Sequence, residues 1–161
     1  AEILQRAIYT DGAERTQLLK HLLKEEHLKQ VLVFVATQHS SEMVAAKLRV
    51  AGIAAEPFHG QLSQGKRQQV LADFKAHRVK VVLATDLASR GLDIEKLPAV
   101  INFDLPRSAV DYTHRIGRTG RAGEAGMRLD VALVDRRGAE APLDDDLGGG
   151  VYYCGYYYDH H

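Results

Sequence analysis

Short, continuous apolar runs alternate in this chain with segments of helical periodicity, and this alternation constrains the fold more than any other feature. Residues 31–36 (VLVFVA) and 79–84 (VKVVLA) are typical of strands that are buried on both faces of a parallel sheet. Helical segments of about 10 to 15 residues separate such runs, as in repeated strand–helix–strand units. The pattern predicts an α/β fold in which a mostly parallel sheet is covered by helices on both faces.

The remaining elements follow the same reading. Further strands are predicted at 4–10 (an edge strand), 53–58, 99–103 and 129–134. Helices are predicted at 16–26, 39–50, 63–77 and 108–116. The second helix has its apolar spacing at Met43, Ala46, Leu48 and Val50, and the third at Val70, Leu71 and Phe74. We expect Gly52 to end the second helix and Ser63 to cap the third.

Polar residues follow the predicted strands at several points along the chain. They are Thr37, His59–Gly60, Thr85–Asp86 and Asn102–Asp104. The carboxyl ends of parallel strands share one edge of a sheet, and ligands of open α/β sheets bind beyond that edge. The sequence therefore predicts a binding site where these residues meet.

A cluster of arginines stands out near the carboxyl end, in the segment 114–121 (HRIGRTGR). Arginine keeps its charge at any working pH, and its planar fork of donors suits phosphate oxygens. In a helix, Arg115 and Arg118 would share one face, and Gly120 would let the backbone bring Arg121 to the same site. The alternative interpretation is that these arginines merely face water.

The segment HRIGRTGR resembles motif VI of the DEAD-box RNA helicases. Related helicase groups usually begin this motif with Gln rather than His114. The resemblance implies a RecA-like three-layer sandwich, the second of two such domains in the whole enzyme. It also implies that Arg118 and Arg121 act as arginine fingers at the γ-phosphate of ATP bound to the first domain, with His114 and Arg115 supporting the motif.

Two earlier segments resemble the same family in the expected order. Residues 34–37 (FVAT) are similar to motif IV, and residues 59–67 (HGQLSQGKR) to its HG segment followed by Gln-x-x-Arg. The resemblance implies RNA-backbone contacts from Thr37, Gly60, Gln64 and Arg67. Gln64 and Arg67 would lie on one side of a helix whose N-terminus can seat a phosphate. Alternatively, Ser63 is merely an N-cap and Arg67 faces solvent.

Residues 84–94 (ATDLASRGLDI) are similar to motif V. In the family this motif touches RNA phosphates through residues matching Thr85 and Asp86, and contacts RNA or the other domain through the match of Arg90. Gly91 and Asp93 would face the nucleotide, with Asp93 near the ribose. Alternatively, the two aspartates pair with Arg90 in a surface network. The matches together extend over roughly residues 5–125 and suggest a bacterial member of the family.

Composition agrees with one domain, which we place at residues 1–135, followed by a tail at 136–161. The 161 residues are 45% hydrophobic and carry zero net charge, but the tail holds −3, so that the domain holds +3. A mild basic excess permits RNA binding. No apolar run approaches the roughly 20 residues that span a bilayer, and no secretory signal opens the chain. With one cysteine, Cys154, a disulfide framework is excluded, and we expect a cytoplasmic location.

The groups that bind and hydrolyse ATP in this family are not found in the sequence. Residues 60–66 have the spacing of a Walker A loop, but Arg67 stands where Ser or Thr is required, and no Asp-Glu-Ala-Asp string occurs. We therefore expect no ATP turnover by this chain alone. ATP and Mg²⁺ would bind only together with an amino-terminal RecA-like domain, and no metal site of the chain's own is predicted. The expected partners are RNA, held by its backbone without sequence readout, and that domain.

The tail departs from the family. Residues 151–161 hold five of the seven tyrosines, and Cys154 with His160 and His161 offers at most a weak metal site. The tail is read as an engineered or reading-frame remnant, or as a segment packed on the domain or on a second copy. Two rival functions remain: a non-catalytic RNA- or protein-binding module, and the second domain of a DNA motor. His114 and the Gln-x-x-Arg pair argue against the DNA motor.

Overall fold

A computed structural model of the protein describes residues 3–24, 28–90, 92, 97, 99–105 and 128–135; the side chains of 3–5, 128–130 and 134–135 are not described. The strands are β1 (Ile3–Thr10), β2 (Val31–Phe34), β3 (Ala55–Phe58), β4 (Val81–Ala84), β5 (Ala99–Asn102) and β6 (Arg128–Asp135). The helices are the 3-10 turn η1 (Gly12–Glu14), α1 (Arg15–Leu23), α2 (Gln38–Val50), α3 (Gln64–Lys75) and α4 (Asp86–Ser89).

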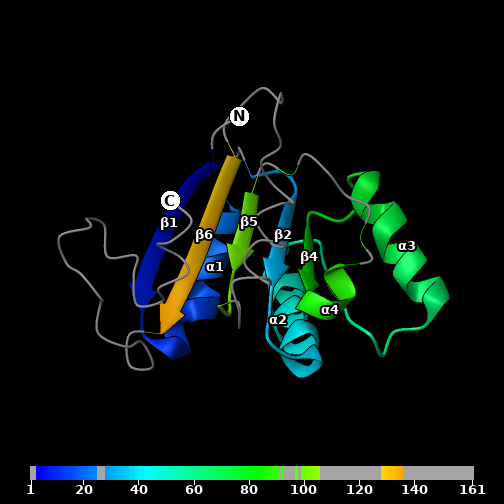
Figure 1. Ribbon diagram of the computed structural model, residues 1–161, viewed down its shortest axis with the longest axis horizontal. Coiled ribbons are helices and arrows are strands. Elements are labelled where there is room, and N and C mark those ends of the chain that lie inside the picture. Colours follow the sequence, from blue (N-terminus) through cyan, green and yellow to red (C-terminus); the bar gives the residue numbers. More distant parts are fainter. Residues whose placement is uncertain are drawn as a thin grey trace.

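The six described strands form one sheet in the order β1-β6-β5-β2-β4-β3, and every neighbouring pair is parallel (Figure 1). The predicted first strand is indeed an edge strand, where it pairs with β6 along eight residues. The strands β2, β4 and β5 are buried at all four positions, as expected of inner strands covered on both faces.

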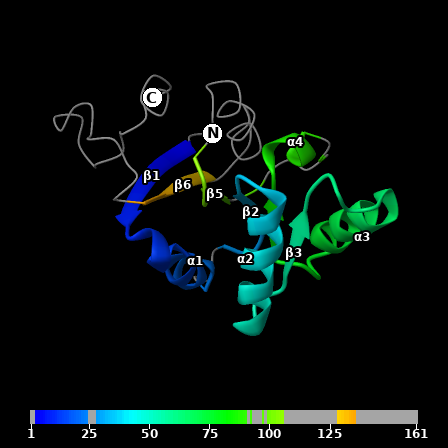
Figure 2. The same ribbon diagram turned by 90° about the horizontal axis from the view of Figure 1, so that it is seen from below.

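Alternate residues of each inner strand belong to two separate hydrophobic cores. In β2, Val31 and Val33 pack with the apolar residues of α1 and α2, whereas Leu32 and Phe34 pack with those of α3. Figure 2 shows α1 and α2 together on one side of the sheet and α4 on the other. This three-layer α/β arrangement confirms the predicted fold class. Within the described chain, no helix combines the length and apolar character needed to cross a membrane.

The buried face of α2 differs from the one predicted. The structure buries Val44, Ala45 and Leu48, whereas Met43 is 41% and Val50 is 91% exposed. The reason is the helical period: residues 41, 44, 45 and 48 recur at spacings of three and four, and position 41 is a serine. Because Ser41 is polar, the apolar spacing of the buried face is interrupted, and the face that includes Met43 and Val50 was predicted to be the inner one instead.

The helix ends are held by specific groups. Gly52 has φ +83° and ends α2 as predicted, with the Ile53 N–H donating to the Leu48 carbonyl at 3.0 Å. At the end of α3 the same left-handed conformation falls on His77, with φ 61°. The Gln30 amide also donates to the Phe74 carbonyl at 2.6 Å, which satisfies an acceptor in the last turn of α3.

The predicted helix at 108–116 and the tail at 136–161 lie outside the described residues.

Candidate nucleic-acid interface

The predicted polar residues gather at one edge of the sheet. Thr37 lies beyond the end of β2, His59–Gly60 directly follow β3, and Thr85–Asp86 follow β4. The three strands are parallel neighbours in the order β2-β4-β3, so their carboxyl ends lie side by side. This rim (residues 37, 59, 60, 85 and 86) is where the sequence predicted the site.

Thr37 has a structural task that the sequence analysis did not assign to it. Its Oγ1 accepts a hydrogen bond from the Ser40 N–H at 3.0 Å and so caps the N-terminus of α2. The side chain is nevertheless exposed at the rim. The residue therefore fixes the start of the helix and remains accessible from solvent.

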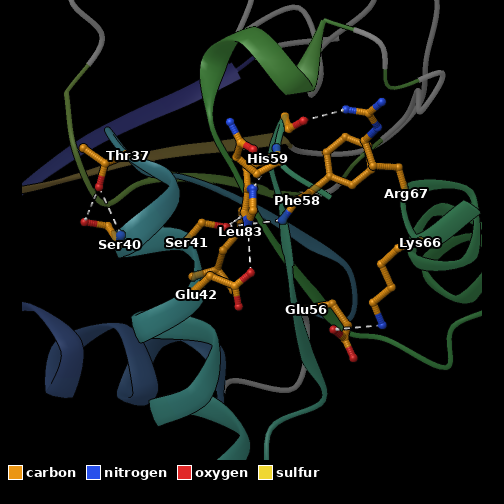
Figure 3. A network of polar contacts seen from close by, with 12 residues as sticks. Thr37, Ser40, Ser41, Glu42, Glu56, Phe58, His59, Lys66, Arg67 and Leu83 are labelled. Carbon is orange, nitrogen blue, oxygen red and sulfur yellow. Dashed lines mark hydrogen bonds and ion pairs between the residues drawn. The ribbon is translucent and has the colours of Figure 1, made fainter. Parts of the chain in front are cut away.

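The turn that follows β3 is organised by His59. This side chain is only 6% exposed, and its Nε2 lies 2.7 Å from Oε1 of Glu42 on α2 (Figure 3). Its Nδ1 accepts the Gln61 N–H at 3.2 Å. With Nδ1 acting as an acceptor, the neutral ring carries its proton on Nε2 and donates it to Glu42. Gly60, at the top of the turn, is exposed, and a Cβ added there would meet no atom within 4 Å.

The first turn of α3 brings Gln64 and Arg67 together as predicted. Ser63 caps the helix by accepting the Lys66 N–H at 3.1 Å. Arg67 Nη2 donates to Gln64 Oε1 at 3.0 Å, and Nη1 points to the Gly60 carbonyl at 3.4 Å (Figure 3). Arg67 is half-buried rather than freely solvated, and it ties the helix to the turn after β3.

A pocket of about 380 Å³ opens beside this arginine. Its lining residues are Phe58, Gly60, Gln64, Arg67, Gln68, Leu71, Leu87 and Ala88. Its polar lining comes from the turn after β3 and from α3, and its apolar lining comes from β3, α3 and α4. Leu87 is 77% exposed, so an apolar group stands free at the mouth of the pocket.

The turn after β4 leads into the short helix α4. Thr85 precedes this helix, but its side chain makes no capping hydrogen bond, unlike that of Thr37. Thr85 and Asp86 are half-buried, and Arg90 is exposed just past the helix. Ser89 Oγ donates to the Asp86 carbonyl at 2.8 Å and stabilises the turn.

Sequence reasoning missed the residue that joins two of the rim strands. Ser41 is fully buried on α2, donates to the Leu83 carbonyl at 2.7 Å and accepts the Phe58 N–H at 3.3 Å. It thereby ties α2 to the carboxyl-terminal parts of β3 and β4, just before the rim residues (Figure 3). The sequence did carry a signal for this role, because Ser41 lies four residues after the N-cap of α2 and so falls on the buried face of the helix.

The residues at and after the end of β5 differ in their contacts. Asn102, the last residue of β5, is buried and donates from Nδ2 to the Val131 carbonyl of β6 at 3.1 Å, which joins the two strands. Asp104 accepts the Ala36 N–H at 2.7 Å through Oδ2 and pairs with Arg15 Nη1 at 3.1 Å through Oδ1. Arg15 also stacks over the Phe103 ring at 4.2 Å and donates to the Phe103 carbonyl.

The remaining predicted site residues lie outside the described part of the chain. They are Gly91, Asp93, His114, Arg115, Arg118 and Arg121. The residues predicted to face the nucleotide are therefore not placed, whereas those predicted to contact RNA lie at the rim or next to it. The role of both groups stays a prediction. In the described chain, no three His, Cys, Asp or Glu side chains are grouped as a metal site.

Comparison with known proteins agrees with this geometry. A profile of the helicase conserved C-terminal domain matches residues 14–123. The ATP-dependent rRNA helicase RRP3 of Debaryomyces hansenii is 41% identical over 124 residues, which cover 77% of this chain and 26% of that protein. The chain spans about a quarter of the length of the curated relatives that it matches.

Solved structures agree as well. The E. coli DEAD-box protein SrmB, bound to the regulator of ribonuclease activity A, is 39% identical with a TM-score of 0.73, covering 83% of this chain and 79% of that one. S. cerevisiae Dbp5 L327V, bound to RNA and ADP BeF3, is 29% identical with a TM-score of 0.72, covering 81% and 35%.

The parallel sheet, the polar rim and these matches define the class: the chain belongs to the helicase conserved C-terminal domain family. Within that class it belongs with the C-terminal RecA-like domains of the DEAD-box RNA helicases.

Proposed function

We propose that this domain supplies part of an RNA-backbone track and the arginine fingers of an ATP-dependent RNA helicase. The observation that carries the proposal is the grouping of Gly60, Gln64 and Arg67 beside Thr85 at one rim. An exposed glycine permits close approach of a sugar–phosphate chain, and a half-buried guanidinium is pre-organised to donate to a phosphate. The RNA complex of Dbp5, a structural relative, supports the same role.

The proposed track reads the backbone and not the bases. Its described groups are a guanidinium, an amide, hydroxyls and a glycine turn, which suit phosphate and ribose oxygens. We expect weak binding by the domain alone, because the other half of the track would lie on the amino-terminal domain. Affinity should fall as salt rises, because each phosphate contact releases counterions.

The track is tested by titrating the chain with a single-stranded ten-nucleotide RNA, following amide chemical shifts. We expect shifts at Gly60, Gln64 and Thr85, and their loss in Arg67→Ala with folding intact. RNA-induced shifts that stay the same in Arg67→Ala as in the parent chain would contradict the proposal. A clear preference for DNA over RNA of equal length would contradict it too. The DNA arm also tests the rival function as a DNA motor domain.

The second half of the proposal concerns ATP, bound together with Mg²⁺ to the amino-terminal domain. When bound, ATP would supply the β–γ phosphoanhydride bond whose hydrolysis drives the helicase cycle. Arg118 and Arg121 would donate to the γ-phosphate from across the cleft, where an arginine finger contributes roughly three to five orders of magnitude in rate. Gly91 and Asp93 would hold the nucleotide on this side, with Asp93 accepting from the ribose hydroxyls.

This half is tested by mixing the chain with a matching amino-terminal domain and measuring RNA-stimulated ATP turnover. We expect turnover in the mixture, none with the chain alone, and a loss of about a thousandfold in Arg118→Ala. Arg90→Ala is a useful comparison, because the family resemblance implies a contact with RNA or with the other domain for this residue instead. Turnover by the chain alone, abolished by Arg118→Ala, would contradict the proposal.

A second candidate function is that of a protein-binding module. It is favoured by the structure of SrmB, a relative solved with the regulator of ribonuclease activity A. A folded chain that supports no turnover in the mixture and shows no RNA-induced shifts would favour this function. The similarity to bacterial members that the sequence suggested is not supported by these relatives, because RRP3 and Dbp5 are from yeasts, although SrmB is from E. coli.

A further inference from the structure

We infer that Glu42 is a positioning residue for RNA binding: it acts through His59 to fix the turn that presents Gly60 and anchors Arg67. The inference rests on the proposed RNA track. Glu42 lies on α2, outside the segments that resemble the family motifs, and its carboxylate does not itself face the track. Figure 3 shows it below the imidazole, on the opposite side from Arg67.

The first step is the contact between Glu42 and His59. Oε1 of Glu42 lies 2.7 Å from Nε2 of His59, a short distance that is typical of a hydrogen bond to a charged group. The histidine side chain is 6% exposed, whereas Glu42 is 51% exposed. The ring is therefore enclosed by the fold, and its outer nitrogen has one acceptor, which comes from α2.

The second step runs from the ring to the turn. Nδ1 of His59 accepts the Gln61 N–H at 3.2 Å, across the intervening Gly60. Both nitrogens are thus engaged, one as donor and one as acceptor, which fixes the orientation of the ring plane. If the bond to Glu42 is lost, only packing and the weaker bond to Gln61 hold the ring plane, so the Gln61 N–H has a less well-placed acceptor.

The third step leads from the turn to the phosphate-binding side chain. The Gly60 carbonyl is the acceptor for Arg67 Nη1 at 3.4 Å, and Gln64 holds the other end of the same guanidinium at 3.0 Å. The orientation of the Gly60 peptide therefore sets one of the two anchors of Arg67. Ser41, next to Glu42 in the chain, bonds to β3 and β4 and keeps α2 in register with this turn.

Charge and position predict opposite effects for this residue, which makes the inference testable. A carboxylate near an RNA track repels phosphate, so by charge alone its removal would strengthen binding. By positioning, its removal would weaken binding. Three substitutions separate the two effects: Glu42→Gln keeps an acceptor oxygen and loses the charge, Glu42→Asp keeps the charge but shortens the reach, and Glu42→Ala loses both.

The experiment titrates the full chain and each variant with single-stranded decauridylate, and follows hydrogen exchange of the Gln61 amide. We expect Glu42→Ala and Glu42→Asp to bind about fivefold more weakly, the factor that corresponds to one net hydrogen bond, while Glu42→Gln stays within about twofold. Exchange at Gln61 should speed up in the first two variants and not in the third. The urea midpoint should change little in Glu42→Gln and fall in Glu42→Ala and Glu42→Asp, because the enclosed His59 N–H then lacks its acceptor. Binding is therefore compared under conditions in which every variant is folded.

Arg67→Ala in the same series separates the failure of this inference from that of the RNA track. Weaker binding by Arg67→Ala with unchanged or tighter binding by Glu42→Ala overturns the positioning role alone. Unchanged binding by Arg67→Ala overturns the track and the inference together. Equal effects of Glu42→Gln and Glu42→Ala, with Gln61 exchange unchanged in both, also overturn the inference, because the acceptor oxygen then has no role.

Discussion

The carboxylate of Asp104 joins three separate segments, and its removal should destabilise the domain measurably. It accepts the Ala36 N–H just past β2 at 2.7 Å and pairs with Arg15 of α1 at 3.1 Å. A hydrogen bond to a charged acceptor contributes about 1.5–3 kcal/mol. The ion pair, whose side chains are 21% and 22% exposed, adds at most about 1 kcal/mol. We therefore expect Asp104→Ala to lower the free energy of unfolding by about 2–3 kcal/mol.

Equilibrium urea unfolding measures this loss. With a slope near 2 kcal/mol per molar urea, the midpoint should fall by about 1 M. Asp104→Asn retains an acceptor for the Ala36 N–H, so it should lose roughly half as much. A double-mutant cycle with Arg15→Met should give a coupling energy of about 0.5–1 kcal/mol. A midpoint for Asp104→Ala within about 0.2 M of the parent would refute the reasoning, because the bond to Ala36 would then have no net value.

Three further predictions concern Gly60, His77 and Asp73. Gly60→Ala should fold normally, because a Cβ added there meets no atom within 4 Å, and it should bind RNA severalfold more weakly than the parent chain. Gly65→Ala is the matched control, because a Cβ at that position is equally unobstructed but Gly65 does not line the pocket. His77→Gly should raise the free energy of unfolding by up to about 1 kcal/mol, because φ is 61°, and a urea midpoint that falls would contradict this. Hydrogen bonds from Gln69 and Arg78 lower the pKa of Asp73 below 3.8, so its contribution to stability is full above that pH and is lost as pH falls through the folded value. Asp73→Asn should therefore differ most from the parent near neutral pH and converge with it in acid; a constant difference between pH 7 and pH 2 would exclude this linkage.

Much of the fold could be predicted from local pattern because each element carries its own signal. The four-residue inner strands are continuous apolar runs, since both faces of a central parallel strand are buried. Gly52 and Ser63 could be recognised as helix ends, because glycine lacks the Cβ that disfavours a left-handed conformation and serine is a common N-cap. The polar rim followed from chain order, because the carboxyl ends of parallel strands share one edge.

Other assignments depended on neighbours that are distant in the sequence. The inner face of α2 was misassigned because Ser41 is buried there, and only the packed structure shows that its hydroxyl bonds to β3 and β4. Local propensity carries no information about such partners, since a buried serine and an exposed one look alike in sequence. Thr37 is a different case, because its capping partner, the Ser40 N–H, lies only three residues away and the cap could have been predicted locally. The hydroxyl that the family resemblance assigned to RNA therefore also caps α2.

The sequence by itself determined which segments are strands, which residues follow them, and that polar side chains gather at their carboxyl ends. These properties depend on periodicity and on side-chain chemistry, which are written along the chain. The tertiary structure alone decided the sheet order β1-β6-β5-β2-β4-β3, the Arg15–Asp104 pair across 89 positions, and the contact between Glu42 and His59. Those contacts form only when elements pack against one another, because the two partners of each bond have no local reason to meet.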